Sequence, residues 1–115
     1  MLKTARPRRS LLYMPGSNRR ALEKGRSLPA DALILDLEDA VAPDAKSQAR
    51  ANIVAALQEG GYGSREIIVR INALDSEWGR EDLETMARSG ADALLLPKVE
   101  SAEMVRQAEA LAQQL

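Results

Sequence analysis

Apolar residues fall into four short runs along the chain, separated by longer segments of mixed polarity. The runs at 10–14, 32–36, 66–71 and 93–97 predict four β-strands. They are apolar at nearly every position, which is typical of parallel strands covered on both faces. The chain therefore reads as four repeated strand–helix units.

The segments between these runs carry helix signals. Ser17 or Asn18 is expected to cap a first helix that ends near Gly25, and Asp44 is expected to cap a second. Further helices are expected around 83–87, closed by Gly90, and from Ser101 to the last residue. The second helix has apolar positions every four residues, ended by three glycines: Ala45, Ala49, Ile53, Leu57, then Gly60, Gly61 and Gly63.

The order of elements predicts an α/β fold of the (β/α)₈ TIM-barrel type, here as about four βα units. Residues 30–35 and 91–96 match at five of six positions, so strands two and four resemble each other. Similar alternate strands suit a barrel, in which alternate strands fill the same interior layers. A four-stranded doubly wound sheet is the alternative, with strand order 2-1-3-4 in place of 1-2-3-4. The first strand–helix turn lacks the glycine pattern of a nucleotide-binding loop.

The amino-acid composition limits the kinds of site and partner that the chain can have. Cysteine and histidine are both absent, which removes disulfides, thiolate zinc sites and histidine bases. No apolar run is long enough for an ordinary membrane span. Residues 1–26 hold eight Lys or Arg and one acid, so a polyanionic partner or a solvated basic face are both open. The three aromatic residues leave little for base stacking, and we expect no nucleic acid partner.

Arg70 is the most informative single residue, because it lies in a strand that is otherwise largely Ile and Val. A buried guanidinium needs an anionic partner. One interpretation is a salt bridge to Glu38, Asp39 or Glu100. The other is a bidentate clamp for a substrate carboxylate.

Three acids, Asp36, Glu38 and Asp39, follow the second strand within four residues. Close carboxylates raise one another's pKa or attract a cation. The simpler interpretation is that Asp36 caps local backbone amides and Asp39 pairs with Arg70.

Two pairs of basic residues are spaced four apart near helix starts: Arg20 and Lys24, then Lys46 and Arg50. Cations beside free helix amides could form a phosphate site. Solvated helix faces are the ordinary alternative.

Four segments, residues 9–17, 31–43, 69–72 and 96–101, read RSLLYMPGS, DALILDLEDAVAP, VRIN and LPKVES. In this order they resemble signatures of the HpcH/HpaI aldolase superfamily, in the branch of citrate lyase β-subunits and malyl- and citramalyl-CoA lyases. The resemblance covers nearly the whole chain.

The resemblance implies a barrel enzyme that cleaves a 3-hydroxyacyl thioester to an acetyl thioester and a 2-keto acid, assisted by Mg²⁺. It implies that Arg70 holds the keto-acid carboxylate, in a substrate site with Glu38, Asp39 and Lys98. It places around coenzyme A, or the pantetheine of an acyl carrier, the positions Tyr13, Arg20, Lys24, Lys46 and Arg50.

The resemblance also implies that the metal ligands and the catalytic acid or base lie on later strands. Residues 1–115 would then be the N-terminal half of a barrel domain, in a cytoplasmic protein that forms a homo-oligomer or pairs with the other half. The alternative is a catalytically incomplete or non-enzymatic subunit that binds another chain.

Overall fold

A computed structural model describes residues 11–97 of the chain. The elements in order are β1 (Leu11–Pro15), α1 (Arg19–Lys24), β2 (Ala32–Asp36), the 3₁₀ helix η1 (Pro43–Ala45), α2 (Lys46–Glu59), β3 (Glu66–Arg70), α3 (Gly79–Ala87) and β4 (Ala93–Leu95). In this part of the chain no helix has the length and apolar character needed to cross a bilayer.

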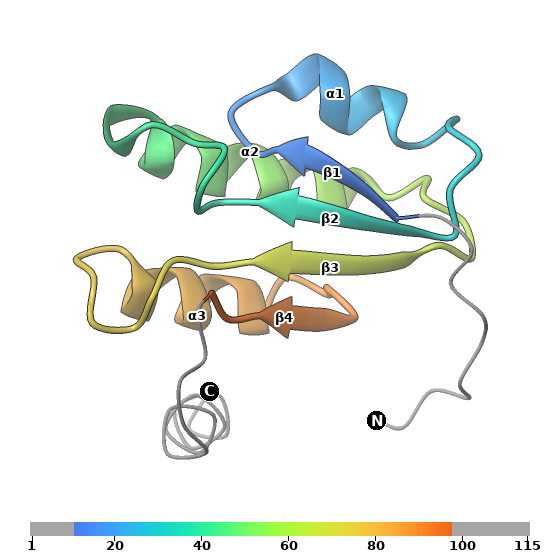
Figure 1. Ribbon diagram of the computed structural model, residues 1–115. Helices are drawn as coiled ribbons and strands as arrows, with labels where there is room; N and C mark the ends of the chain where they lie inside the picture. Colours follow the sequence, from blue (N-terminus) through green and yellow to red (C-terminus); the bar gives the residue numbers. More distant parts are fainter. Residues whose placement is uncertain (1–10, 98–115) are drawn as a thin grey trace.

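The strands form one parallel sheet in the order β1-β2-β3-β4 (Figure 1). Strands that are neighbours in the sequence are thus neighbours in space, as predicted, and the doubly wound order 2-1-3-4 is wrong. An open parallel sheet whose strands alternate with helices in this order is part of an α/β barrel.

The two faces of the sheet have different neighbours. Leu33, Leu35 and Val69 belong to the main core cluster, together with Ile53 of α2 and Leu83 of α3. Side chains alternate along a strand, so the intervening residues point to the opposite face, away from the helices. That second face corresponds to the interior of a barrel.

The predicted strand positions are confirmed, with small shifts at the ends. β2 has the predicted bounds, whereas β1 lies one residue later and β3 one residue shorter than predicted. β4 ends at Leu95 and not at Pro97, because Leu95 is the partner of Arg70, the last residue of β3.

One of the predicted helix caps is wrong. Asn18 caps α1 as predicted, and its side chain accepts a hydrogen bond from Ala21 N at 3.1 Å. The prediction that Asp44 caps the second helix is wrong, since Pro43 begins a 3₁₀ turn that contains Asp44, and Ala45 precedes α2. Gly60 ends α2 with φ of +70°, as expected for a helix-ending glycine.

α3 ends at Ala87, and Gly90 lies in the turn that follows, with φ of +89°. The helix predicted after Ser101 lies outside the described residues.

Candidate functional site

The carboxyl ends of β2 and β3 bring Asp36 and Arg70 together. The two residues are direct partners in the parallel register, so both side chains lie on the face turned away from the helices. Arg70 Nε donates to Asp36 Oδ1 at 2.8 Å, and Arg70 Nη2 donates to Asp36 Oδ2 at 2.8 Å. The pair is a bidentate ion pair at the rim where barrel enzymes place their active sites.

Asp36 is fully buried and also organises the loop that follows β2. Its Oδ1 accepts from Glu38 N at 2.9 Å and its Oδ2 accepts from Ala40 N at 2.8 Å. Burial alone would raise the pKa of Asp36, but the hydrogen bonds from Arg70 and then from these two amides outweigh burial. The pKa of Asp36 therefore lies below its ordinary value, and the carboxylate is charged.

Arg70 is held on more than one side. Glu38 Oε1 lies 3.6 Å from Nε, and the guanidinium carbon lies 5.1 Å from the centre of the Tyr13 ring. The hydrogen bonds to Asp36 raise the pKa of Arg70 above its ordinary value. Within residues 11–97, Nη1 makes no hydrogen bond, and the side chain remains 21% exposed. The guanidinium thus keeps donors that could bind an anion.

The salt-bridge interpretation of Arg70 named the wrong main partner. Asp36 takes the bidentate position, Glu38 is a longer contact, and the suggested pairing with Asp39 is wrong, because Asp39 is exposed at the loop surface. The capping role suggested for Asp36 is confirmed. Glu100 and Lys98 lie outside the described residues.

Lys46 lies in a second polar cluster, behind the loop that follows β2. The side chain is buried, and Nζ donates to Leu37 O at 3.1 Å, to Glu38 O at 2.8 Å and to Asn72 Oδ1 at 2.7 Å. The Trp78 ring centre lies 5.0 Å from the same nitrogen. Lys46 therefore fixes the loop that carries Glu38.

Arg50 and Asp82 extend this cluster to α3. Arg50 donates to Asp82 Oδ1 from Nε at 2.9 Å and from Nη2 at 2.7 Å, and Nη1 pairs with Glu81. Asp82 Oδ2 accepts from Asn72 N at 3.0 Å and from Asn72 Nδ2 at 2.6 Å. Buried as they are, Lys46 and Arg50 do not form the solvated helix face that was the ordinary alternative.

The remaining predicted thioester-binding residues are accessible. Arg20 and Lys24 are exposed on α1, and Tyr13 is 56% exposed beside Arg70. Asp82 was not singled out in the sequence, because an acid in the first turn of a helix is usually a solvated residue that complements the helix dipole.

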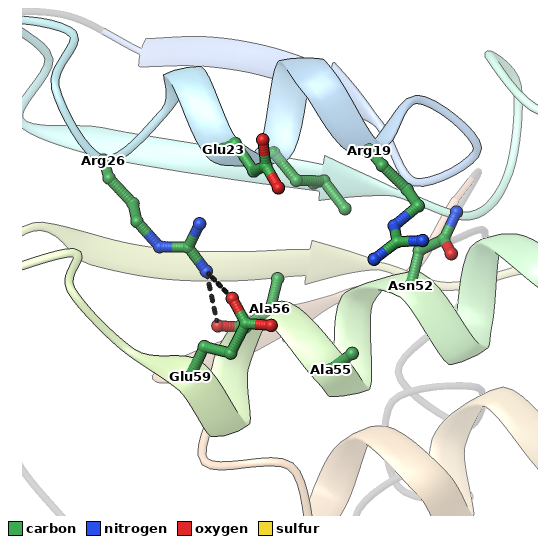
Figure 2. Close-up of a pocket in the computed structure, with 8 residues that line it drawn as sticks. Arg19, Glu23, Arg26, Asn52, Ala55, Ala56 and Glu59 are labelled. Atoms are coloured by element: carbon green, nitrogen blue, oxygen red, sulfur yellow. Dashed lines mark hydrogen bonds and ion pairs between the residues drawn. The ribbon is translucent and has the colours of Figure 1, made fainter.

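A separate groove lies between α1 and α2 (Figure 2). Arg26 crosses it and donates to Gly60 O at 2.7 Å, to Ala56 O at 3.2 Å and to Glu59 Oε2 at 3.2 Å. These bonds tie the turn after α1 to the end of α2, so the groove is a helix contact on the outer side of the sheet.

The described residues do not fit a Mg²⁺ cage. No group of three or more Asp or Glu side chains surrounds a common point within residues 11–97. Each oxygen of Asp36 already accepts one guanidinium and one amide hydrogen bond, which leaves it poorly placed as a ligand.

The fold and the rim define a class of protein, a partial α/β barrel with an arginine–aspartate pair at the carboxyl ends of its strands. The profile of the HpcH/HpaI aldolase/citrate lyase family matches residues 9–115, and the chain belongs to this family.

Two curated relatives illustrate the range within the family. The chain is 56% identical over 102 residues to a (3S)-malyl-CoA thioesterase of Cereibacter sphaeroides, covering 89% of this chain and 36% of the relative. It is 48% identical over 103 residues to the citrate lyase subunit beta of Escherichia coli K12, covering 90% of this chain and 34% of the relative. The chain thus spans about a third of the length of these relatives.

Solved structures agree with the fold. The protein CitE from Mycobacterium tuberculosis, in complex with magnesium and acetate, superposes with a TM-score of 0.72 at 34% identity, covering 84% of this chain and 39% of that one. The same protein with magnesium, acetoacetate and coenzyme A gives a TM-score of 0.66 at 30% identity, covering 85% and 35%.

Proposed function

We propose that residues 1–115 form the N-terminal half of a barrel domain in a carbon–carbon lyase. The substrate would be a 3-hydroxyacyl thioester of the citryl, malyl or citramalyl type, on coenzyme A or an acyl carrier. Cleavage of the bond between the hydroxyl-bearing carbon and the carbon next to the thioester carbonyl would give a 2-keto acid and an acetyl thioester. Family membership and the relatives named above support this class of reaction.

The observation that carries the proposal is the placement of Arg70. It lies at the carboxyl rim on the interior face, with donors at Nη1 and Nη2 that Asp36 does not use. A carboxylate of the substrate would accept two parallel hydrogen bonds there. Glu38 lies on the same rim, and we propose that Asp39 and Lys98 belong to it as well.

For the thioester arm, exposed residues are the better candidates. Tyr13 lies beside Arg70, and Arg20 and Lys24 are exposed on the first helix after β1. Most hydrogen-bond donors of Lys46 and Arg50 bind protein groups. We therefore propose that these two residues support the rim from within the protein.

Mg²⁺ is proposed for the whole enzyme, because the similar CitE structures are complexes with magnesium. When bound it would supply Lewis-acid stabilisation of developing oxyanion charge. Its ligands are expected outside residues 11–97. Calorimetric titration of the 115-residue chain should show no stoichiometric micromolar Mg²⁺ site, and such a site would contradict this placement.

Thioester hydrolysis is the second candidate, favoured by the 56% identity to a malyl-CoA thioesterase. Here water attacks the thioester carbonyl, the carbon–sulfur bond breaks, and the hydroxy acid and the free thiol are released. The two reactions differ in their products, since only the lyase yields a 2-keto acid and an acetyl thioester.

The experiment has two arms. The enzyme that contains these residues is incubated with malyl-CoA, citramalyl-CoA and citryl-CoA, and the keto acid and free thiol are measured. In the second arm, pyruvate is titrated into the 115-residue chain. Arg70→Lys should weaken pyruvate binding about tenfold, because lysine lacks the planar fork.

Arg88→Lys is the matched control, since Arg88 is exposed at the far end of α3. Equal pyruvate affinity in the wild type and Arg70→Lys would remove Arg70 from the site.

A further inference from the structure

The geometry points to Asp36 as a positioning residue for Arg70. We propose that Asp36 holds the Nε–Nη2 edge of the guanidinium, so that the Nη1–Nη2 edge faces the carboxylate of the substrate. This inference rests on the proposed function, because it concerns the same arginine.

Asp36 is itself held in place on several sides. It ends a strand whose backbone pairs on both sides, its side chain is fully buried, and each of its oxygens accepts one loop amide. The carboxylate therefore presents a fixed pair of acceptors, and the planar guanidinium must align with them. A second contact, the Tyr13 ring against the guanidinium, restricts the tilt of that plane.

The edge that remains is the one suited to a second carboxylate. Asp36 uses Nε and one hydrogen of Nη2, and within the described residues no group accepts from Nη1. The Nη1–Nη2 edge carries two parallel N–H groups. Held in this way, Arg70 would bind an incoming carboxylate without first losing rotamer freedom.

The negative charge of Asp36, taken by itself, would have the opposite effect on anion binding. Asp36 neutralises Arg70, and Glu38, 3.6 Å away, adds further negative charge. If Asp36 acted only through its field, removing its charge would strengthen the binding of an anion. If Asp36 positions Arg70, the same change weakens binding. The sign of the effect therefore separates the two roles.

The test is titration of pyruvate into the full chain and its Asp36→Asn variant. Asn is nearly isosteric and keeps one acceptor oxygen, and a dispersed amide spectrum verifies folding. We expect about tenfold weaker binding, which is the cost of an unaligned bidentate contact. Asp44→Asn, the same change at an exposed residue of η1, is the control and should leave the affinity unchanged. Equal or tighter binding by Asp36→Asn would overturn the inference.

A second measurement uses only the wild-type chain. The Arg70 Nε–H group should give a slowly exchanging ¹⁵N–¹H signal that persists at saturating pyruvate, because pyruvate occupies the other edge. Loss of this signal on titration would mean that pyruvate displaces Asp36, and the inference would fail. If Arg70→Lys binds pyruvate as well as the wild type, Arg70 lies outside the site and the observation that carries the proposed function fails. If only Asp36→Asn binds normally, the inference alone fails.

Discussion

At the scale of single residues, the Asp36–Arg70 pair combines two demands on one carboxylate. Asp36 stabilises the loop after β2 through two amides and fixes a guanidinium at the rim. Each demand needs the ionised form. The chain has no histidine or cysteine, and the structure brings a carboxylate and a guanidinium together at one strand edge.

The first prediction concerns acid stability. Because the pKa of Asp36 is lowered in the folded chain, its stabilising effect is fully present above the ordinary value of 3.8 and is lost as pH falls through the lowered pKa. Arg70→Gln should reduce the free energy of unfolding at pH 7 by about 3 kcal/mol, the cost of leaving a buried charge unpaired. It should also reduce the loss of stability that the wild type shows as pH falls below 3.8.

Urea unfolding at several pH values measures both effects. Arg88→Gln, at an exposed position, should match the wild type throughout. A variant Arg70→Gln with wild-type stability and acid dependence would show that the pair contributes nothing to folding.

The pairing of Asp36 with Arg70 could have been found from the sequence. Both residues end strands of five residues, so a parallel register that aligns the strand starts also aligns the ends. Arg70 was expected to pair with Glu38, Asp39 or Glu100, which follow the strands, and Asp36 was assigned only to capping. Asp36 caps the loop and pairs with Arg70 at once, so assigning it a single role hid the pairing.

At the scale of elements, apolar patterning located all four strands, since burial on both faces leaves a clear signal. Patterning failed where two local sequence signals pointed to different helix starts. Asp44 has the right residue type for a helix cap, but Pro43 favours the first position of a helical turn and starts η1 before it. The buried cluster around Asp82 was missed because its partners lie 32 and 10 residues away in the sequence.

The second prediction concerns this cluster, which joins α2, α3 and the end of β3. Asp82→Ala removes the acceptor of Asn72 N, Asn72 Nδ2 and two Arg50 donors, all of them buried. The free energy of unfolding should fall by roughly 3–5 kcal/mol, because an unpaired buried guanidinium is left behind. Glu84→Ala, at an exposed position of the same helix, should change stability by less than about 0.5 kcal/mol. A small effect for Asp82→Ala would show that water replaces the carboxylate.

The third prediction concerns the approach of α2 to the strand ends. A Cβ on Gly16 would lie 2.8 Å from Ile53 Cδ1 and 2.9 Å from Asp36 O. The carbonyl of Asp36 cannot yield, since it accepts the hydrogen bond of Gly16 N at 2.8 Å. Gly16→Ala should therefore lower the free energy of unfolding by about 2 kcal/mol through overpacking. Ser17→Ala, at the exposed next residue, is the control, and equal stability of the two variants would refute the close contact.

At the scale of the whole molecule, the fold class follows from the order of the elements, and the comparisons place the chain in its family. Patterning could not give the exposure of individual strand residues, because it assumes that every apolar strand is covered. Within residues 11–97, β1 and β4 are the outer strands of an open sheet. Residues 1–115 are predicted to be half of a barrel domain and to depend on a partner chain. Both predictions are therefore best tested at these two outer strands.

The last prediction is association. Leu11, Tyr13 and Leu95 lie on the face turned away from the helices and are 46%, 56% and 38% exposed. Unpaired strand edges and exposed apolar side chains favour contact with another chain. The 115-residue chain should therefore sediment as concentration-dependent oligomers. The double variant Leu11→Lys, Leu95→Lys should shift it toward monomer, whereas Arg88→Lys should not. A monodisperse 12.5 kDa monomer at every concentration would contradict this prediction, since such a chain would need no covering partner.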